Sequence, residues 1–213
     1  MAGGFSLEWN GQTFTDAGAG LSAFGRDLEQ RWDGSVKAVS QELSRMLADI
    51  SAQLIAMHGR SWPDGTTQSS LSSRSGALVE AIRTGFSVSG TTLNTLVGRF
   101  TLPPPYEIHE TGGTMRARGG NFMAIPLPAA LDGKGLPLKA SPRDWEDTFC
   151  AMSRNGNLLI FQKRGTTIVP LYVLKTSVTL PARLRVNDTF QTNLPRFLDR
   201  MVDRIAAAMT DKP

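Results

Sequence analysis

Apolar residues spaced three or four apart dominate the first quarter of the chain. Their average step of about 3.6 residues is the period of an α-helix, so they predict a long helix over residues 17–58. The helix should end near Gly59, where glycine can take the left-handed conformation of a helix cap. The alternative is two helices separated at Gly34. The stripe consists of Leu21, Phe24, Leu28, Trp32, Val36, Val39, Leu43, Met46, Ile50, Leu54 and Met57.

This predicted helix is too long for one small core to cover. Its apolar stripe alone runs over about 36 residues, or some 55 Å at 1.5 Å per residue, which is more than the diameter of a small domain. Part of its apolar stripe is therefore expected to contact another subunit.

Shorter patterns flank this helix. Alternating residues around Asn10-Gly11 predict a hairpin or arm within residues 1–16, because this dipeptide favours a tight turn. The Ser-, Thr- and Gly-rich segment 59–75 is typical of an exposed loop. Ser75 is a good cap for a short helix that ends at Gly85. Another hairpin is expected after it, with its turn at residues 89–92.

The second half of the chain has the pattern of an antiparallel sheet followed by a helix. Residues 123–127 read as a strand, and 128–147 as an irregular excursion. Three strand-like runs follow, separated by glycine-containing turns, which predicts a meander. Residues 185–213 predict a C-terminal helix in which Thr192 or Asn193 is the cap and Pro195 lies in the first turn. The chain is thus expected to be a single α+β domain over residues 1–213, its two long helices packed on antiparallel sheet, with extended hairpin loops.

Charge is distributed unevenly along the chain. The net charge is −3 over residues 1–57, +2 over 58–120 and +5 over 121–213. Such asymmetry suits nucleic-acid binding, but it equally suits a subunit that places an acidic surface against a neighbour's basic one. Lys/Arg blocks and aromatics interleaved with basic residues are missing from the sequence, which disfavours base-reading or base-stacking modules.

Several other classes find little support in the sequence. Cys150 is the single cysteine, which excludes an intrachain disulfide and suits a reducing cytoplasm. Because free cysteine is commonly buried, Cys150 is expected to be a small apolar residue of a strand. The sequence shows neither a long apolar run nor a secretory signal pattern, so no membrane association is expected.

The stretch YEIHETGGTMRARGG, residues 106–120, is the main candidate for chemistry. On a strand Glu107 and His109 would share one face, giving the histidine a single carboxylate neighbour. A metal site needs three or four ligands, and His58 is the only other histidine. The glycine- and arginine-rich part, without Lys-Ser or Lys-Thr before a helix, does not match a phosphate-binding loop. No catalytic residue, cofactor site or metal site is therefore expected.

Four motifs in this order resemble the tail-completion and head-tail joining proteins of long-tailed bacteriophages and prophages. They are RSGAL (74–78), YEIHETGGTMRAR (106–118), MAIPL (123–127) and VPLYVLKTSVTLPARL (169–184). They cover most of a family-like core over 74–184. The chain differs in its longer 128–147 segment and longer first helix, which leaves open whether it resembles the tail terminator or an adjacent neck adaptor.

The resemblance implies a non-enzymatic α+β subunit that forms a ring, as a hexamer, in the neck of a virion assembled in the host cytoplasm. The tail tube protein and a head-completion or connector protein would be its partners, with DNA passing through the lumen. A nucleic-acid-binding or nucleic-acid-processing phage protein is the alternative. The expected assembly interface comprises Tyr106, His109, Glu110, Gly112, Gly113, Arg116, Arg118, Pro181 and Arg183. Residues 112–120 are expected to form the flexible tip of a hairpin, with both arginines on one face.

Overall fold

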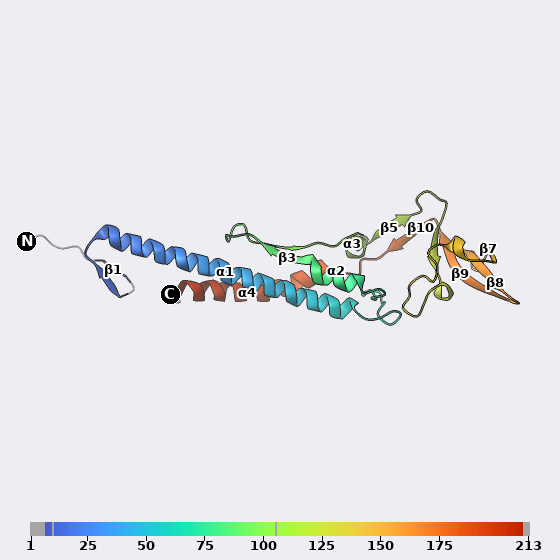
Figure 1. Ribbon diagram of the computed structural model, residues 1–213, viewed down its shortest axis with the longest axis horizontal. Coiled ribbons are helices and arrows are strands. Elements are labelled where there is room, and N and C mark those ends of the chain that lie inside the picture. The colour runs from blue at the N-terminus through green and yellow to red at the C-terminus, as the bar shows by residue number, and fades with distance from the viewer. Residues whose placement is uncertain (1–6, 10, 105, 211–213) are drawn as a thin grey trace, which may run out of the picture. The chain divides into compact units, whose positions relative to one another are not determined.

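The computed structural model describes residues 7–9, 11–104 and 106–210, and confirms the α+β class with long N- and C-terminal helices and antiparallel sheets (Figure 1). The chain groups into two compact units, each built from segments distant in sequence. The first contains residues 1–50, 86–100 and 190–213, and the second contains 51–85 and 101–189.

Helix α1 (Ala17–His58) is continuous through Gly34, as the apolar stripe predicts. Its length corresponds to about 63 Å at 1.5 Å per residue. Gly59 continues the helical bonding, its N–H donating to the Ile55 carbonyl oxygen at 2.7 Å. The expected left-handed cap at Gly59 is therefore wrong. The reason for glycine here is space, since a Cβ would lie 2.6 Å from that same oxygen.

The first unit is built around the N-terminal four-fifths of α1. Strands β3 (Phe86–Ser89) and β4 (Val97–Phe100) form the expected hairpin. Its turn is wrong as predicted, because Ser89 pairs with Val97 and the connection runs over residues 90–96. A Cβ on Gly98 would lie 3.1 Å from the Leu43 side chain, so the hairpin backbone rests closely on α1. Strands β1 (Leu7–Trp9) and β2 (Gln12–Phe14) also pair as predicted, while Asn10 lies outside the described residues.

Helix α4 (Val186–Thr210) lies beside α1 in this unit (Figure 1). Polar contacts join the two helices. Arg31 pairs with buried Asp27 at 2.7 Å and donates to the Met209 carbonyl oxygen at 2.6 Å. Glu42, also buried, forms an ion pair with Arg200. A buried charge is costly unless it is paired, so these contacts favour the arrangement in which Asp27 and Glu42 keep their partners.

The second unit contains the short helix α2 (Ala77–Gly85), which buries Leu78 and Ile82 as expected. Ser75 caps it weakly, its hydroxyl oxygen accepting from the Ala77 N–H at 3.4 Å. This unit also contains α3 (Glu107–Thr111), the 3₁₀ turns η1 (Pro128–Ala130) and η2 (Pro142–Asp144), the end of α1 and the start of α4. The two 3₁₀ turns lie in the predicted irregular excursion.

A four-stranded antiparallel sheet completes this unit, in the order β6-β9-β8-β7. The predicted strand and meander are β6 (Met123–Pro126), β7 (Thr148–Met152), β8 (Leu158–Arg164) and β9 (Thr167–Lys175). Leu171 and Tyr172 are buried against Ala130, and the indole N–H of Trp145 donates to the Tyr172 hydroxyl oxygen at 3.0 Å. This small cluster anchors the excursion to the sheet.

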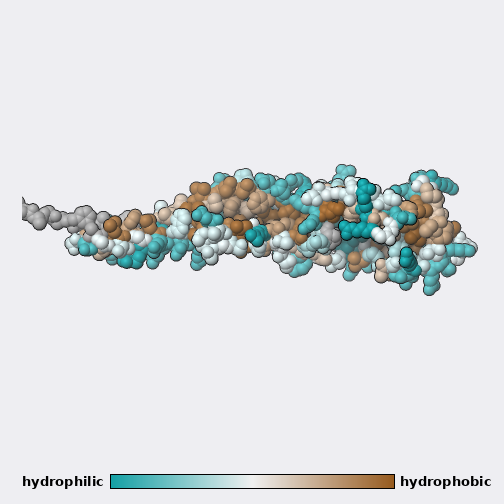
Figure 2. Space-filling view, turned by 90° about the horizontal axis from the view of Figure 1, so that it is seen from above, coloured by the Kyte–Doolittle hydropathy of each residue, from teal (hydrophilic) through white to brown (hydrophobic). Residues whose placement is uncertain are grey.

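Apolar surface remains uncovered on this sheet, as the brown atoms over it in Figure 2 show. Phe149, Met152 and Ile168 are exposed. Cys150 is exposed as well, so the expectation of a buried cysteine is wrong. Its strand, β7, is an edge of the sheet and has a single paired neighbour. Separately, no helix in the described ranges has both the length and the hydropathy that crossing a membrane requires.

Candidate functional site

The segment that carries the candidate chemistry is helical where a strand was expected. Residues 107–111 form the single-turn helix α3, which Tyr106 precedes in the right-handed helical region. Alternation of side chains therefore does not apply. Glu107 and Glu110, three residues apart, now share a face, and His109 points elsewhere. Pairing of Glu107 with His109 on one strand face was a wrong interpretation.

Gly112 and Gly113 turn the chain from α3 into a strand. Gly112 has φ 69°, and a Cβ there would lie 3.0 Å from the Ala182 nitrogen, so only glycine allows this approach to the segment containing Pro181. Strand β5 (Gly113–Arg116) then pairs antiparallel with β10 (Ser177–Leu180). Residues 113–116 thus belong to a two-stranded sheet between distant segments, and the predicted hairpin tip over 112–120 is wrong for them.

Arg116 ends β5 and Arg118 follows it, and both side chains are exposed. They lie at the far end of β5 from α3. The sequence-predicted residues therefore fall into two groups. Around α3 come together Tyr106, His109, Glu110, Gly112, Gly113, Pro181 and Arg183, whereas Arg116 and Arg118 lie apart from them.

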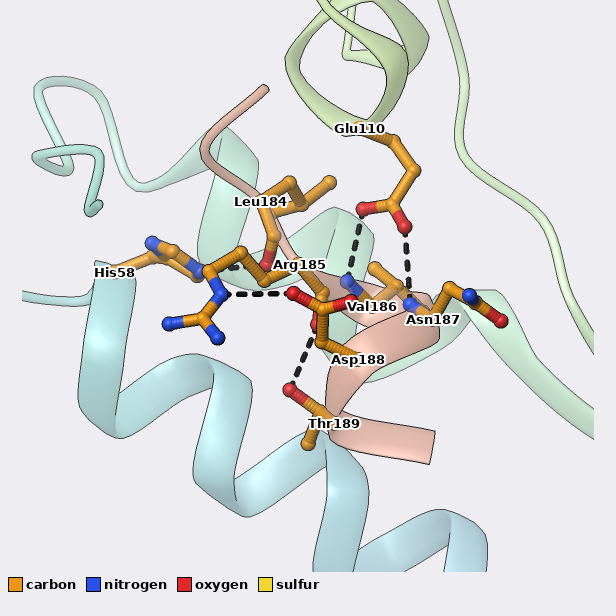
Figure 3. Close-up of polar contacts among 8 residues, drawn as sticks. All are labelled: His58, Glu110, Leu184, Arg185, Val186, Asn187, Asp188 and Thr189. Atoms are coloured by element: carbon orange, nitrogen blue, oxygen red, sulfur yellow. Dashed lines mark hydrogen bonds and ion pairs between the residues drawn. The ribbon is translucent and has the colours of Figure 1, made fainter. Parts of the chain in front are cut away.

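Glu110 caps helix α4 from 76 residues away (Figure 3). Its two carboxylate oxygens accept from the backbone N–H groups of Val186 and Asn187 at 2.8 and 2.9 Å. The first N–H groups of a helix have no acceptor within the helix, and a negative charge there also favours the helix dipole. The remote carboxylate explains why α4 begins at Val186.

The predicted start of the C-terminal helix is therefore wrong. Thr192 and Asn193 lie inside α4 rather than capping it, and Pro195 is its tenth residue. The local pattern of cap and proline was persuasive, but the effective cap comes from another element. Arg185, with φ 57°, makes the turn into the helix.

His58, at the end of α1, is fully buried and joined to two other segments. The Leu71 N–H donates to its Nδ1 at 3.1 Å, and Nε2 lies 2.9 Å from the Leu184 carbonyl oxygen (Figure 3). Because Nδ1 accepts, the proton is assigned to Nε2, which donates to Leu184. Burial lowers the pKa of His58, against the opposing effects of the Leu184 carbonyl and the Glu110 carboxylate.

His109 is held through its backbone, and its ring lies beside an arginine. Its carbonyl oxygen accepts from the N–H groups of Arg183 and Leu184 at 2.7 and 2.8 Å. Burial lowers the pKa of the His109 ring, and the Arg183 guanidinium lowers it further. Both effects favour the neutral imidazole at pH 7.

We refer to His58, His109, Glu110, Arg183 and Leu184 as the α3 junction. Both ring nitrogens of His58 and both carboxylate oxygens of Glu110 are engaged within it. The junction therefore ties together the end of α1, helix α3 and the start of α4. Sequence reasoning missed His58 as a member, although a histidine at the end of an apolar stripe was a signal that it could be buried.

The described residues contain no cluster of three or more His, Cys, Asp or Glu side chains that could hold a metal ion. Comparisons of the chain with protein-family models, curated proteins and solved structures find no match.

Proposed function

We propose that this chain is a structural virion protein that assembles with copies of itself into a ring at the head-tail junction of a long-tailed bacteriophage. The ring would be hexameric, join the tail tube to the head connector and leave a lumen for DNA. The order of the four motifs supports the family, and the surface of the chain supports self-assembly.

The observation that carries the proposal is the exposed half of the α1 stripe. From Val39 onward the stripe is largely buried, whereas Leu21 and Trp32 are 63% and 51% exposed. Exposing large apolar side chains in a row along one helix is unfavourable in water, and such surfaces commonly mark protein interfaces. This half of the helix suits contact with a neighbouring copy.

A groove of about 500 Å³ lies on this exposed half. Among the described residues its apolar lining is Leu28, Trp32 and Met209, and two acidic residues, Glu29 and Asp33, lie beside them. A complementary partner would therefore present an apolar side chain flanked by positive charge.

The turn between β8 and β9 presents that combination. Ile168 is 57% exposed and lies opposite Lys163 in the pairing of β8 with β9. Arg164 follows Lys163 in the chain. We propose that this turn of one copy occupies the groove of the next. Because the two surfaces are different, the contact is heterologous and repeats around a closed ring.

A charge-swap experiment tests the contact. Native mass spectrometry and electron microscopy of the purified chain, alone and with the tail tube protein of its phage, are expected to reveal rings. Glu29→Lys with Asp33→Lys should abolish the rings, as should Lys163→Glu with Arg164→Glu. Combining all four changes should restore them, since the charges are opposite again.

Asp49→Lys provides the matched control, because Asp49 is an exposed acid of the same helix outside the groove. It should leave the rings intact. Monomers at all concentrations and with the tail tube present would refute ring assembly. Rings that survive both double variants would refute this interface while leaving the ring itself standing.

A further inference from the structure

A second pocket, of about 380 Å³, lies within the second unit, beside the α3 junction. Three basic side chains line it, those of Arg74, His109 and Arg183, and no described lining residue is acidic. Arg74 and Arg183 are charged at pH 7, whereas His109 is neutral there. Positive charge in a concave site that has no acidic lining residue among those described attracts an anion. The pocket is separate from the α1 groove and from the β8–β9 turn, so it does not depend on the proposed ring contact.

Two buried side-chain nitrogens of pocket-lining residues have no hydrogen-bond partner among the described residues. They are Nε of Arg183 and Nδ1 of His109. Buried polar atoms are nearly always paired in folded proteins, so two unpaired ones in one pocket call for an explanation. Neutral imidazole can carry its proton on Nδ1, and an oxyanion can accept from both groups.

Arg74 is held in position at the same pocket. One of its terminal N–H groups donates to the Gly135 carbonyl oxygen at 2.7 Å, and its guanidinium lies 5.6 Å from the centre of the Trp62 ring. These contacts orient the guanidinium and use one of its five N–H donors. Pre-positioning of this kind lowers the entropic cost of ligand binding.

The rest of the lining is apolar or carries hydroxyl groups. Leu71, Leu78 and Leu136 supply aliphatic surface. A bare inorganic ion would leave this surface unused, whereas a carboxylate on an apolar body would cover it. We propose that the pocket binds a carboxylate attached to a small apolar group, such as the end of a peptide chain or a free organic acid.

Titration of the ¹⁵N-labelled chain, followed by NMR, tests the site. N-acetyl-leucine is expected to bind saturably and to shift the amides around Arg74, His109 and Arg183. N-acetyl-leucinamide, which has the same body without the charge, should not bind. A peptide ending in leucine with a free carboxylate, compared with its amidated form, distinguishes a chain end from a free acid.

Substitutions of the pocket arginines show whether the carboxylate binds in this pocket. Arg183→Gln should weaken it by about tenfold to a hundredfold, the value of one charge-assisted hydrogen bond. Arg74→Gln is the second variant if Arg183→Gln does not fold, and Arg118→Gln, exposed and outside the pocket, is the matched control. Equal binding of the amide, preference for inorganic phosphate, or unchanged affinity in the folded pocket variants would overturn the proposal.

Discussion

Removing the remote cap of α4 should destabilise the chain measurably. Glu110→Ala takes away the acceptor for two backbone N–H groups at 2.8 and 2.9 Å. Loss of a helix cap costs about 0.5–2 kcal/mol, and loss of the charge at the helix N-terminus adds about 0.3–1 kcal/mol. Because Glu110 is partly buried, water replaces its oxygens incompletely, and we expect a total of about 2–3 kcal/mol.

The effect should be visible in two measurements. For a chain of this size, 1 kcal/mol lowers Tm by about 2–4 °C, so Glu110→Ala should lower it by roughly 4–12 °C. Hydrogen exchange should also accelerate at the amides of Val186 and Asn187, because these are the groups that lose their acceptor. Glu110→Gln, which keeps one acceptor oxygen, should show a smaller effect on both.

Glu107→Ala is the control, since Glu107 belongs to the same short helix and its side chain is exposed. Its Tm should stay within about 2 °C of the unaltered chain. If Glu110→Ala and Glu107→Ala had the same Tm, and if exchange at Val186 and Asn187 did not change, the carboxylate would not be the cap that stabilises α4.

Three other predictions follow from the same structure. The folded-state pKa values of His58 and His109 are lowered. Their contribution to the free energy of unfolding is therefore complete above about pH 6.5 and is lost as the pH falls toward the folded-state pKa values. Urea unfolding should show this decline in stability, and His58→Gln should make the decline smaller. Glu42→Gln should cost about 2–3 kcal/mol in thermal unfolding, since it leaves a partly exposed arginine of α4 without its ion-pair partner. Arg116→Ala with Arg118→Ala should leave Tm unchanged, because both are exposed; under the proposed neck function the same variant should yield separate heads and tails.

Each of these has an outcome that would contradict it. A urea midpoint that stays constant between pH 7.5 and pH 5.5 would disagree with the buried, neutral histidines. Glu42→Gln with unchanged stability, next to a Gln41→Ser control on the same helix, would show that the α1–α4 ion pair contributes nothing net. Normal infectious titre of the double arginine variant would mean that those arginines are only solvated.

The sequence was informative wherever structure is set by local periodicity or turn chemistry. The stripe from Leu21 to Met57 predicted α1, and Asn155-Gly156 and Arg164-Gly165 marked the turns of the meander. The length of the stripe alone also indicated that one small core would leave part of it uncovered. In each case neighbouring residues determine the outcome, so no knowledge of distant contacts was needed.

The errors arose where distant segments decide. Residues 107–111 have no periodicity long enough to distinguish a strand from one helical turn, and the pairing of β5 with β10 joins segments about 60 residues apart. The start of α4 depends on Glu110, so local capping rules selected the wrong residues. The α3 junction could be predicted only as a set of candidate residues, because its geometry depends on contacts such as that between His58 and Leu184, 126 positions apart.

The remote cap also bears on the order in which the chain folds. Before Glu110 can accept hydrogen bonds from the amides of α4, the two ends of the 76-residue segment between them must come together. This segment contains the four-stranded sheet. The entropic cost of closure rises with the logarithm of the free loop length, so a sheet that has already formed shortens the loop and lowers that cost. We therefore expect the sheet to form before the first turn of α4, and the cap of this helix to form late, from a carboxylate that is synthesised well before it.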